Sequence, residues 1–459
     1  MSGPRPTRLP NWRREALRTT LWFVPTVLIG VAALVFVVTV AIDVAAFFHH
    51  IDLPTWLRTG SAQTGRDVLI AIAAAIITVV GVVFSITILA LTLASQQFGP
   101  RMMRNFVRDL GNQVTLGVFV ATFVYAVLVL GAITVFPHGG FVPHLSVAVA
   151  EAMLLLDLAV LVYFINHIAA SIQLPEVIAG IARDLESAID VEFPVRPGEA
   201  PAGALDVVVA ASPSRSAELL TTIEDRGGVV LASKSGYLQF VGYAQLAAIA
   251  QTLDAVIRLD YRPGHFIVAG RPLAKVFPDD AAKQVERAIA RAHVTGPHRT
   301  LLQDPLFAID QLVEIAIRAL SAAVNDTFTA LTCLDWIASG LSRMSGRELA
   351  ERVYRDDNGR IRLIAADWSY AKMVNRAFDK IRQAARGMPA VIIRMLDSLW
   401  AVAEATTSPA QRDALQRQGD MVYAAARESV ADRNDLDDIE QRYRRLTDYV
   451  NSRDRPTTT

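Results

Sequence analysis

The sequence predicts a mainly α-helical membrane protein, in which four transmembrane helices are followed by a cytoplasmic α+β domain. Two observations lead to this prediction. The chain of 459 residues is 52% hydrophobic, yet its apolar residues concentrate before about Ile168 and its charges gather after it. The first third also contains four apolar stretches of the length needed to cross a bilayer, whose hydrocarbon core of about 30 Å requires about 20 residues of helix.

The four predicted spans contain few charges. They cover residues 21–47, 68–94, 114–136 and 145–168, after an N-terminal tail of residues 1–20. A secretory signal peptide is the rival interpretation of the first span. Its apolar run is too long for one, however, and no small-residue cleavage pattern follows it. We therefore expect an integral membrane domain over residues 21–168.

The arginines predict the orientation of the spans. The N-terminal tail carries five of them, and the loop between spans two and three carries Arg101, Arg104 and Arg108. The loop between spans one and two holds only Arg58 and Arg66, and the loop between spans three and four holds none. Because short loops rich in Lys and Arg stay in the cytoplasm, we expect a multi-pass protein of the bacterial inner membrane with both termini cytoplasmic.

The part of the chain after the spans is predicted to form two subdomains. Residues 169–203 read as a helix and a linker, residues 204–278 as a small β-rich subdomain, and residues 279–459 as a helical subdomain. In the β-rich part, runs of β-branched and aromatic residues alternate with turns that contain glycine. One helix, from Tyr243 to Leu253, is expected among these strands.

The helical subdomain has recognisable start signals. Asp304 precedes Pro305 at the beginning of an apolar pattern of helical period, so its carboxylate is expected to cap the free backbone N–H groups. Asn325 or Asp326 is expected to cap the next helix in the same way. Three more helices are predicted between residues 369 and 450.

Three stretches resemble the hallmark sequences of one bacterial family. They are Ser95-Gln96-Gln97-Phe98-Gly99-Pro100-Arg101 with Arg104-Asn105-Phe106, then Ser235-Gly236-Tyr237-Leu238-Gln239, and then Arg299-Thr300 with Gln303-Asp304 and Asn325-Asp326. In these residues the chain resembles the predicted membrane proteins known as domain of unknown function 2254, over nearly its whole length. The resemblance implies the topology and no activity, so function has to be argued from the residues.

Span two carries a stripe of small and polar residues on one helix face. Its members are Ala74, Thr78, Gly81, Ser85, Thr92 and Ser95, with Gln96 and Gly99 extending it. Small residues let helices approach closely and hydroxyls bond between them, so one interpretation is a packing seam between spans or protomers. The other is a pore lining, in which hydroxyls replace part of the hydration shell of an ion.

Three acidic residues lie within the predicted spans. Asp43 falls at the outer end of span one, where we expect it to reach water. Glu151 lies about two turns into span four and Asp157 near mid-membrane, and the six residues between them place the two side chains on different helix faces. A carboxyl at mid-membrane is costly to insert, so Asp157 is either a structural tie between helices or part of an ion or proton path.

Four histidines lie in or beside the two outward loops, namely His49, His50, His138 and His144. If these loops converge, the histidines could form a metal site or a pH sensor, with Asp52 as a further ligand. No two of them have the spacing of metal ligands on a helix. The alternative is that they are ordinary residues of the membrane interface, beside Trp56 and Phe141.

We expect no enzyme activity and no cofactor. Capping explains Asp304 and Asp326, and the sequence has no Gly-rich phosphate loop, nucleophile elbow or pair of metal ligands. The segment 356–359 imitates the start of a calcium loop but lacks its closing glutamate, and Asn358-Gly359 instead predicts a hairpin turn. Nucleic acid is not an expected partner because the net charge is zero, and Cys333 is the single cysteine.

The function that these features favour is an oligomeric channel or transport protein for cations or protons, regulated by its cytoplasmic domain. Its expected partners are the lipid bilayer, further copies of the chain and a small ion. Four spans with one polar stripe enclose little by themselves, so a conducting path is expected to need several protomers. The alternative is a membrane-anchored structural or sensory protein, in which the spans only anchor and dimerise.

Overall fold

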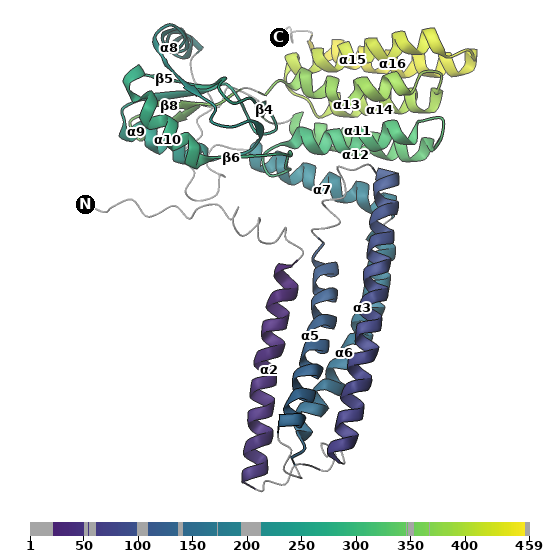
Figure 1. Ribbon diagram of the computed structural model, residues 1–459. Helices are drawn as coiled ribbons and strands as arrows, with labels where there is room; N and C mark the ends of the chain where they lie inside the picture. Colours follow the sequence, from purple (N-terminus) through teal and green to yellow (C-terminus); the bar gives the residue numbers. More distant parts are fainter. Residues whose placement is uncertain are drawn as a thin grey trace. The chain divides into compact units, whose positions relative to one another are not determined.

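The computed structural model divides the chain into two compact units, residues 1–176 and 177–459. Figure 1 shows their elements. The structure describes residues 22–49, 54, 61–98, 109–135, 141–171, 173–193, 213–345, 347, 353–366 and 368–454. Side chains are not described at 94–98, 134–135, 213–217 and 454, although these residues belong to helices.

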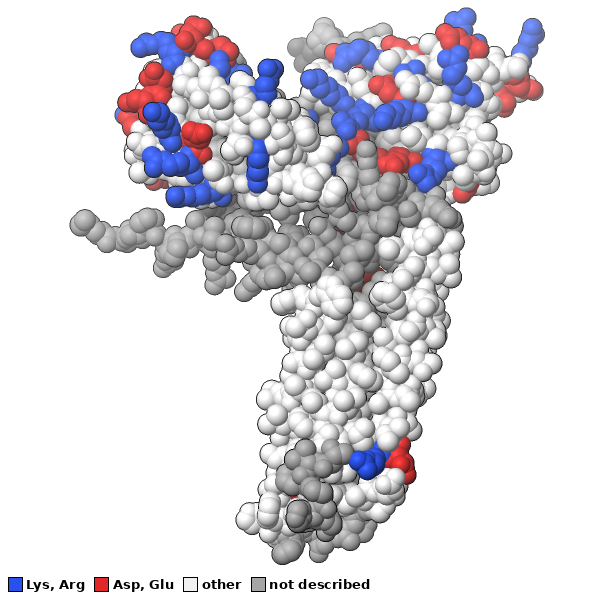
Figure 2. All heavy atoms as spheres, in the orientation of Figure 1, with Lys and Arg blue, Asp and Glu red and all other residues white. Residues whose placement is uncertain are grey.

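The N-terminal unit consists of four long helices that lie side by side (Figure 1). They are α2 (Phe23–Phe48), α3 (Ala62–Phe98), α5 (Leu110–Val135) and α6 (His144–Ser171). By length and composition, all four can cross a membrane. Their visible surface carries almost no charge, whereas blue and red side chains cover the second unit (Figure 2). The four predicted spans are therefore confirmed as helices, and α3 begins six residues before its predicted start at residue 68.

Helix α5 lies at the centre of this unit, in contact with α2, α3 and α6. Its side chains Phe119 and Tyr125 are fully buried, together with Leu69 of α3 and Phe164 of α6. A close approach of α2 to α5 depends on Gly117, because a Cβ there would lie 2.6 Å from Leu28 and 3.1 Å from the Pro25 backbone. Helix α6 also contacts the other three helices, so α5 and α6 together line much of the interior of the unit.

The second unit contains both helices and strands. Its helices are α7 (Leu174–Glu192), α8 (Pro213–Arg226), α9 (Tyr243–Thr252), α10 (Ala282–Ala292), α11 (Pro305–Ala319), α12 (Thr327–Ser345), α13 (Tyr370–Ala384), α14 (Pro389–Glu404), α15 (Pro409–Ser429) and α16 (Arg433–Asp454). Its strands are β1 (Gly228–Leu231), β2 (Gly236–Val241), β3 (Val256–Leu259), β4 (Phe266–Ile267), β5 (Pro272–Phe277), β6 (His293–Gly296), β7 (Val353–Arg355) and β8 (Ile361–Ile364).

The strands form two sheets, with the orders β1-β5-β3-β8-β7 and β4-β2-β6. Strand β8 pairs in parallel with β3, so residues 353–364 return to the sheet after three intervening α-helices, α10, α11 and α12. The β-rich part therefore extends past the predicted boundary at residue 278, and helix α8 precedes its first strand. The helix expected from Tyr243 is confirmed as α9, which packs with α10 on the buried side of the strands.

The remaining helices form the second part of this unit. Four of them, α13 to α16, fill the region in which three were expected. The turn at Gly359 has a positive φ of 74°, as the Asn-Gly pair predicts, and it joins β7 to β8. Asp356 stabilises this turn, because its carboxylate accepts hydrogen bonds from the N–H groups of Asn358 and Arg360 and from Arg362. The calcium-like segment is therefore a β-turn.

Helix α7 follows α6 after two residues and is bound to α12 by a set of contacts that we call the α7–α12 clamp. Gly340 of α12 leaves room for Leu185, which a Cβ at residue 340 would approach to 2.5 Å. The carboxylate of Asp190 accepts hydrogen bonds from Arg343 and Arg347. The side chain of Arg347 also donates to the carbonyl oxygens of Ile189 and Phe193 at the end of α7. One arginine thus caps α7 and pairs with its acid.

The clamp predicts that replacing Arg347 destabilises the protein more than replacing Arg343. Arg347 is 6% exposed and Arg343 is 43% exposed. Arg347→Ala should lower the free energy of unfolding by roughly 2–3 kcal/mol, because it removes charged hydrogen bonds and leaves the α7 carbonyls uncapped. Thermal unfolding of the full chain in detergent measures the change.

The matched control is Arg343→Ala, whose exposed ion pair should contribute under about 1 kcal/mol. Hydrogen bonds from Arg343 and Arg347 lower the pKa of Asp190. The ion-pair stability is therefore present above about pH 4, the ordinary range of aspartate, and is lost as the pH falls through the lowered pKa. The difference in the free energy of unfolding between wild type and Arg347→Ala should therefore narrow in acid. An equal loss of stability in Arg347→Ala and Arg343→Ala would contradict the clamp.

Candidate functional site

The polar stripe of span two lies on the outside of the four-helix unit. Thr78, Ser85 and Thr92 are exposed, and each hydroxyl donates to a carbonyl of its own helix at 2.8 Å. A Cβ added at Gly81 would meet nothing within 4 Å. The stripe is therefore not a seam between spans of one protomer, and its role between protomers stays a prediction. The side chains of the remaining motif residues, Ser95, Gln96, Gln97, Phe98, Pro100, Arg101 and Arg104, lie outside the described ones.

At one end of the unit, Asp43 of α2 holds the first turn of α6. Its carboxylate accepts hydrogen bonds from the backbone N–H groups of Leu145 and Ser146, both at 2.9 Å, and from the Ser146 hydroxyl at 2.7 Å. An acid at this position satisfies free N–H groups and complements the positive end of the helix dipole. The expectation that Asp43 reaches water is wrong, because this carboxylate is only 3% exposed and the donors of α6 replace water.

The same end contains a buried tyrosine. The hydroxyl of Tyr125 on α5 lies 2.9 Å from Thr39 Oγ1 and donates to the carbonyl oxygen of Ser146 at 3.2 Å. Thr39, Asp43, Tyr125 and Ser146 form what we call the α6-start cluster. The cluster connects three helices through hydrogen bonds that are shielded from solvent.

Asp157 lies at the middle of α6, the fourteenth of its 28 residues. It is 2% exposed, and its Oδ1 lies 3.2 Å from the hydroxyl of Thr122 on α5. That hydroxyl is also 3.2 Å from the carbonyl oxygen of Val118. The Asp157 Oδ2 atom is buried and has no hydrogen-bond partner among the described residues. Within the described part of the chain, Asp157 is therefore bonded at one oxygen only.

The Thr122 hydroxyl has one proton and two acceptors within reach. It can donate to an ionised Asp157, or it can donate to Val118 and accept a hydrogen bond from a protonated Asp157. Both arrangements are compatible with the observed positions of the heavy atoms. The geometry around Asp157 therefore accommodates the carboxyl with and without its proton.

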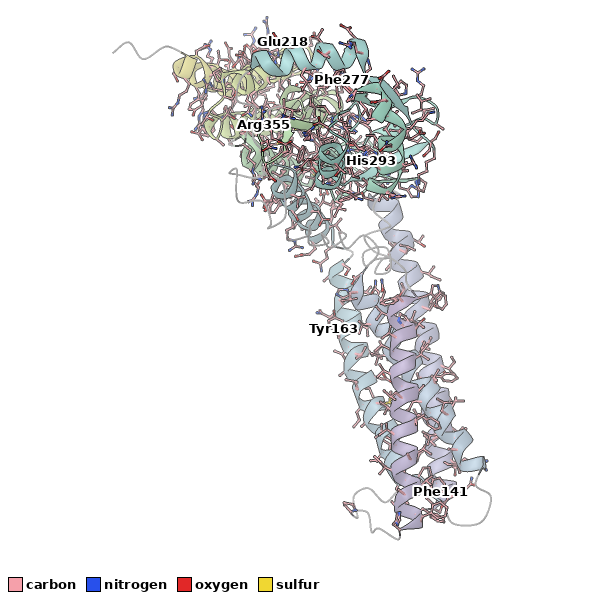
Figure 3. All side chains as sticks on the ribbon, turned by 90° about the vertical axis from the view of Figure 1, so that its left-hand side faces the viewer. Phe141, Tyr163, Glu218, Phe277, His293 and Arg355 are labelled. Carbon is pink, nitrogen blue, oxygen red and sulfur yellow. The ribbon has the colours of Figure 1, made fainter. Side chains whose placement is uncertain are left out.

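The other end of the unit holds an Asp–His pair. His167 Nε2 of α6 lies 2.6 Å from the carboxylate of Asp109, which also accepts the N–H of Gly111 at 2.8 Å. The ring of Tyr163 stacks on His167, with centroids 5.4 Å apart. Figure 3 shows Tyr163 and Phe141 toward opposite ends of the helices. The pair depends on Gly111, because a Cβ there would lie 2.6 Å from Nε2.

Buried polar residues on one side of α5 lie between these places. They are Asn112, Thr115, Thr122 and Tyr125. The Asn112 amide and the Thr115 hydroxyl have no hydrogen-bond partner within the described part of the chain. Fully buried Phe119 lies between Thr115 and Thr122 on the same side of the helix. We call the set from the α6-start cluster through Asp157 to the Asp109–His167 pair the polar column.

Sequence reasoning missed most of the polar column. Of its members it identified Asp157 as a candidate and Asp43 as an acid at the outer end of span one. The available signal was the spacing of Asn112, Thr115, Thr122 and Tyr125 by three, seven and three residues, which is a helical face like that of the span-two stripe.

The other predicted membrane residues are not part of the column. Glu151 is exposed on α6, so it lies on a different face from Asp157, as expected. His49 is an exposed residue at the end of α2, and His144 begins α6. His50, His138 and Asp52 lie outside the described residues. Among the residues that the structure does describe, no group of three or more His, Cys, Asp or Glu could hold a metal ion.

The acids of the second unit have structural partners. Asp326 caps α12 as predicted, accepting the N–H and the hydroxyl of Thr329. Asp304 precedes α11, but its side chain does not cap the helix. Arg299 binds both Asp304 oxygens, at 2.7 and 2.9 Å, and thereby takes the carboxylate away from the N–H groups. Burial raises the pKa of Cys333 to about 12, so its thiol stays protonated.

Comparisons with known proteins place the chain among membrane proteins. A family model described as a predicted membrane protein, DUF2254, matches residues 18–401. Uncharacterized proteins of Mycobacterium bovis and Mycobacterium tuberculosis are 32% identical over 385 residues, which is 82% of this chain and 71% of theirs. No solved structure matches.

The Asp109–His167 pair predicts the outcome of a substitution at Gly111. Gly111→Ala should displace His167 and lower the free energy of unfolding by about 1–3 kcal/mol, the usual cost of forcing extra volume into a packed site. Gly131→Ala is the matched control on the same helix, because a Cβ there meets nothing within 4 Å. It should be neutral or stabilise by up to about 1 kcal/mol.

Thermal unfolding in detergent compares the two variants. In a His167→Ala background the cost of Gly111→Ala should fall sharply, because the ring is gone and only the looser contact with Asp109 Oδ1 at 3.1 Å remains. An equal cost with and without the His167 ring would show that the substitution acts elsewhere.

Proposed function

The chain belongs to the DUF2254 family of predicted membrane proteins, and we propose that its N-terminal unit transfers protons across the membrane along the polar column. The observation behind this proposal is Asp157, a buried carboxyl at the middle of α6 with one oxygen bonded to Thr122 and the other without a described partner. Such a residue costs about 2.5–3.5 kcal/mol on insertion scales when it sits at the centre of a span. A structural tie would be expected to bond both of its oxygens.

A proton suits the column better than a metal cation does. The three ionisable places are Asp43, which binds Ser146, then Asp157, and then the Asp109–His167 pair. Along α6, Asp157 lies eleven residues from Ser146 and ten from His167, so these places are roughly 15 Å apart along the helix. Calcium needs six to eight oxygen ligands around one point. Carboxylates that are spread singly cannot supply them, whereas a proton passes between hydroxyl and carboxyl groups one at a time.

The two halves of the column differ. On the side of the α6-start cluster, Tyr125 and Thr122 are one helical turn apart on α5, so polar groups follow one another closely. On the other side, Thr122 and Thr115 are two turns, or roughly 10 Å, apart. Buried Phe119 lies between them. We propose that this ring is the barrier to proton transfer, in the manner of hydrophobic constrictions that exclude water.

The orientation and assembly belong to the same proposal. With both termini in the cytoplasm of a bacterium, the α6-start cluster faces outward and the Asp109–His167 pair faces the cytoplasm, as does the second unit. The clamp of α7 to α12 supports regulation by that unit, because α7 continues from α6. The column lies inside one protomer, so transfer does not require the oligomer expected earlier. Association through the exposed α3 stripe remains part of the proposal.

A structural or sensory protein without transport is the second candidate. Asp43 favours it, because three hydrogen bonds to α6 explain that acid entirely by helix capping. If Asp157 and His167 also serve only to hold helices together, the spans are an anchor. The two candidates differ in whether wild-type protein carries protons.

Proton flux in liposomes tests the proposal. Asp157→Asn should reduce the flux roughly a hundredfold, the lower end of what a positioned proton-transfer group contributes. The free energy of unfolding should change by under about 1 kcal/mol, because Asn keeps the size of the side chain. Glu151→Gln is the matched control, since this acid is exposed on the same helix, and it should keep wild-type flux.

A pH-sensitive dye inside the liposomes reports the flux under an imposed potential. Wild-type flux in Asp157→Asn would remove Asp157 from the path. Wild-type liposomes no leakier than empty ones would favour the structural alternative.

If the Phe119 ring is the barrier, removing it should raise the proton flux, whereas Asp157→Asn should reduce it. Phe119→Ala should raise proton leakage, because water can enter the space between Thr122 and Thr115. The substitution should also cost about 3–5 kcal/mol of stability, so the control is Leu69→Ala, which opens a cavity at a buried position of α3 for about 2–5 kcal/mol. Equal leakage in both variants would show that the effect comes from loosened packing.

A further inference from the structure

The turn between α11 and α12 carries the most exposed large apolar side chain in the described part of the chain. Phe328 is 82% exposed and Val324 is 55% exposed. Most other large apolar side chains that are more than half exposed lie on the four long helices of the first unit, where lipid covers them. Exposed apolar groups that gather at one place on the remainder of a protein mark a contact surface.

The exposure of these two side chains is fixed by the backbone of the turn. The N–H of Asn325 donates to Ser321, and the N–H of Asp326 donates to Ala319, both at 2.8 Å. Asn325 has a positive φ of 50°, and Asp326 caps α12 through Thr329. The turn is thus closed by its own hydrogen bonds. The segment 321–325 between the helices contains no charged residue, and the charge of Asp326 is engaged in the cap.

The position of this turn follows from the contacts of α7 with α12. Leu185 lies against Gly340, and farther along both helices Arg347 bonds to Phe193. The two helices therefore run in the same direction. Counting back eleven residues from Leu185 reaches Leu174, the start of α7, and counting back twelve from Gly340 reaches Phe328. At 1.5 Å per residue, the two starts lie at the same level to within about one helical turn.

The start of α7 is tied to the membrane by the chain itself. Helix α6 has 28 residues and is therefore about 42 Å long, the thickness of a bilayer with its headgroups. It ends at Ser171, and α7 begins three residues later, a distance that the chain spans in at most about 10 Å. The first turn of α7 is therefore held by the chain close to the headgroup layer at which α6 ends.

We propose that the α11–α12 turn inserts Val324 and Phe328 into the headgroup layer of the phospholipid bilayer on the side where α6 ends. Small apolar groups that reach this layer can penetrate it by about 5–10 Å. Lipid is favoured over a second protein copy, because two side chains and a short uncharged turn fall far below the roughly 1,200–2,000 Å² that a stable interface buries. The proposal requires that the four helices cross the membrane and that the turn faces the bilayer, and it is independent of proton transfer.

The full chain in a bilayer can test this contact with a spin label. Cys333 is the single cysteine, so Cys333→Ala gives a background without thiols. Val324→Cys in that background carries the label at the turn while Phe328 stays in place. The sample is one copy of the protein per nanodisc of phosphatidylethanolamine and phosphatidylglycerol, and a melting curve checks that each labelled variant is folded.

Collision rates with oxygen, which enters lipid, and with a water-soluble nickel chelate report where the label lies. The ratio of the oxygen rate to the nickel rate should be several-fold higher at residue 324 than at a control label, Phe266→Cys, placed at an exposed apolar position of β4. Adding Phe328→Asp should return the ratio at residue 324 to the control value.

Two results would overturn the proposal. One is a ratio at residue 324 equal to that of the control, which would place the turn in water. The other is protection from both reagents, which would place it against protein, either another part of this chain or a second copy.

Discussion

The carboxylate of Asp43 holds the first turn of α6 in a region where lipid offers free backbone N–H groups no other acceptor. Its partners are more than a hundred residues away along the chain, so one side chain fixes the level of α6 against α2. Tyr125 then bonds to the same Ser146 from α5. With α6 fixed at its start, Asp157 and His167 take positions set by the rise of the helix, opposite Thr122 and Asp109. The column depends on this one cap.

The spans could be predicted from the sequence because hydropathy and length are local properties. Which polar face turns inward is not local. The stripe of α3 and the buried face of α5 have the same helical period, but Thr78, Ser85 and Thr92 bond to their own backbone and face outward. Thr122 and Tyr125 instead bond across helices. Periodicity shows that a face exists, and only the packing of neighbouring helices decides which face becomes the interior.

In the second unit, too, the sequence predicted local features and not long-range contacts. The caps and turns at Asp326 and Gly359 were predictable, because each depends on residues within a few positions. The cap expected at Asp304 failed, because Arg299 competes for its carboxylate with two charged hydrogen bonds. Strands β7 and β8 return to a sheet begun a hundred residues earlier. A short apolar run gives no sign of which distant edge it will pair with, so the predicted boundary at residue 278 divided one sheet.

Helix α7 joins the two units along the chain. Its acid is held by two arginines of α12, and its last carbonyls are held by one of them, so α7 from Val177 onward belongs to the second unit. Its first residue follows α6 so closely that a displacement of α7 must act on the helix that carries Ser146, Asp157 and His167. Because these three residues share one helix, a small axial shift of α6 would alter every contact of the column at once. Under the proposed regulation, a change in the second unit would reach Asp157 through this connection.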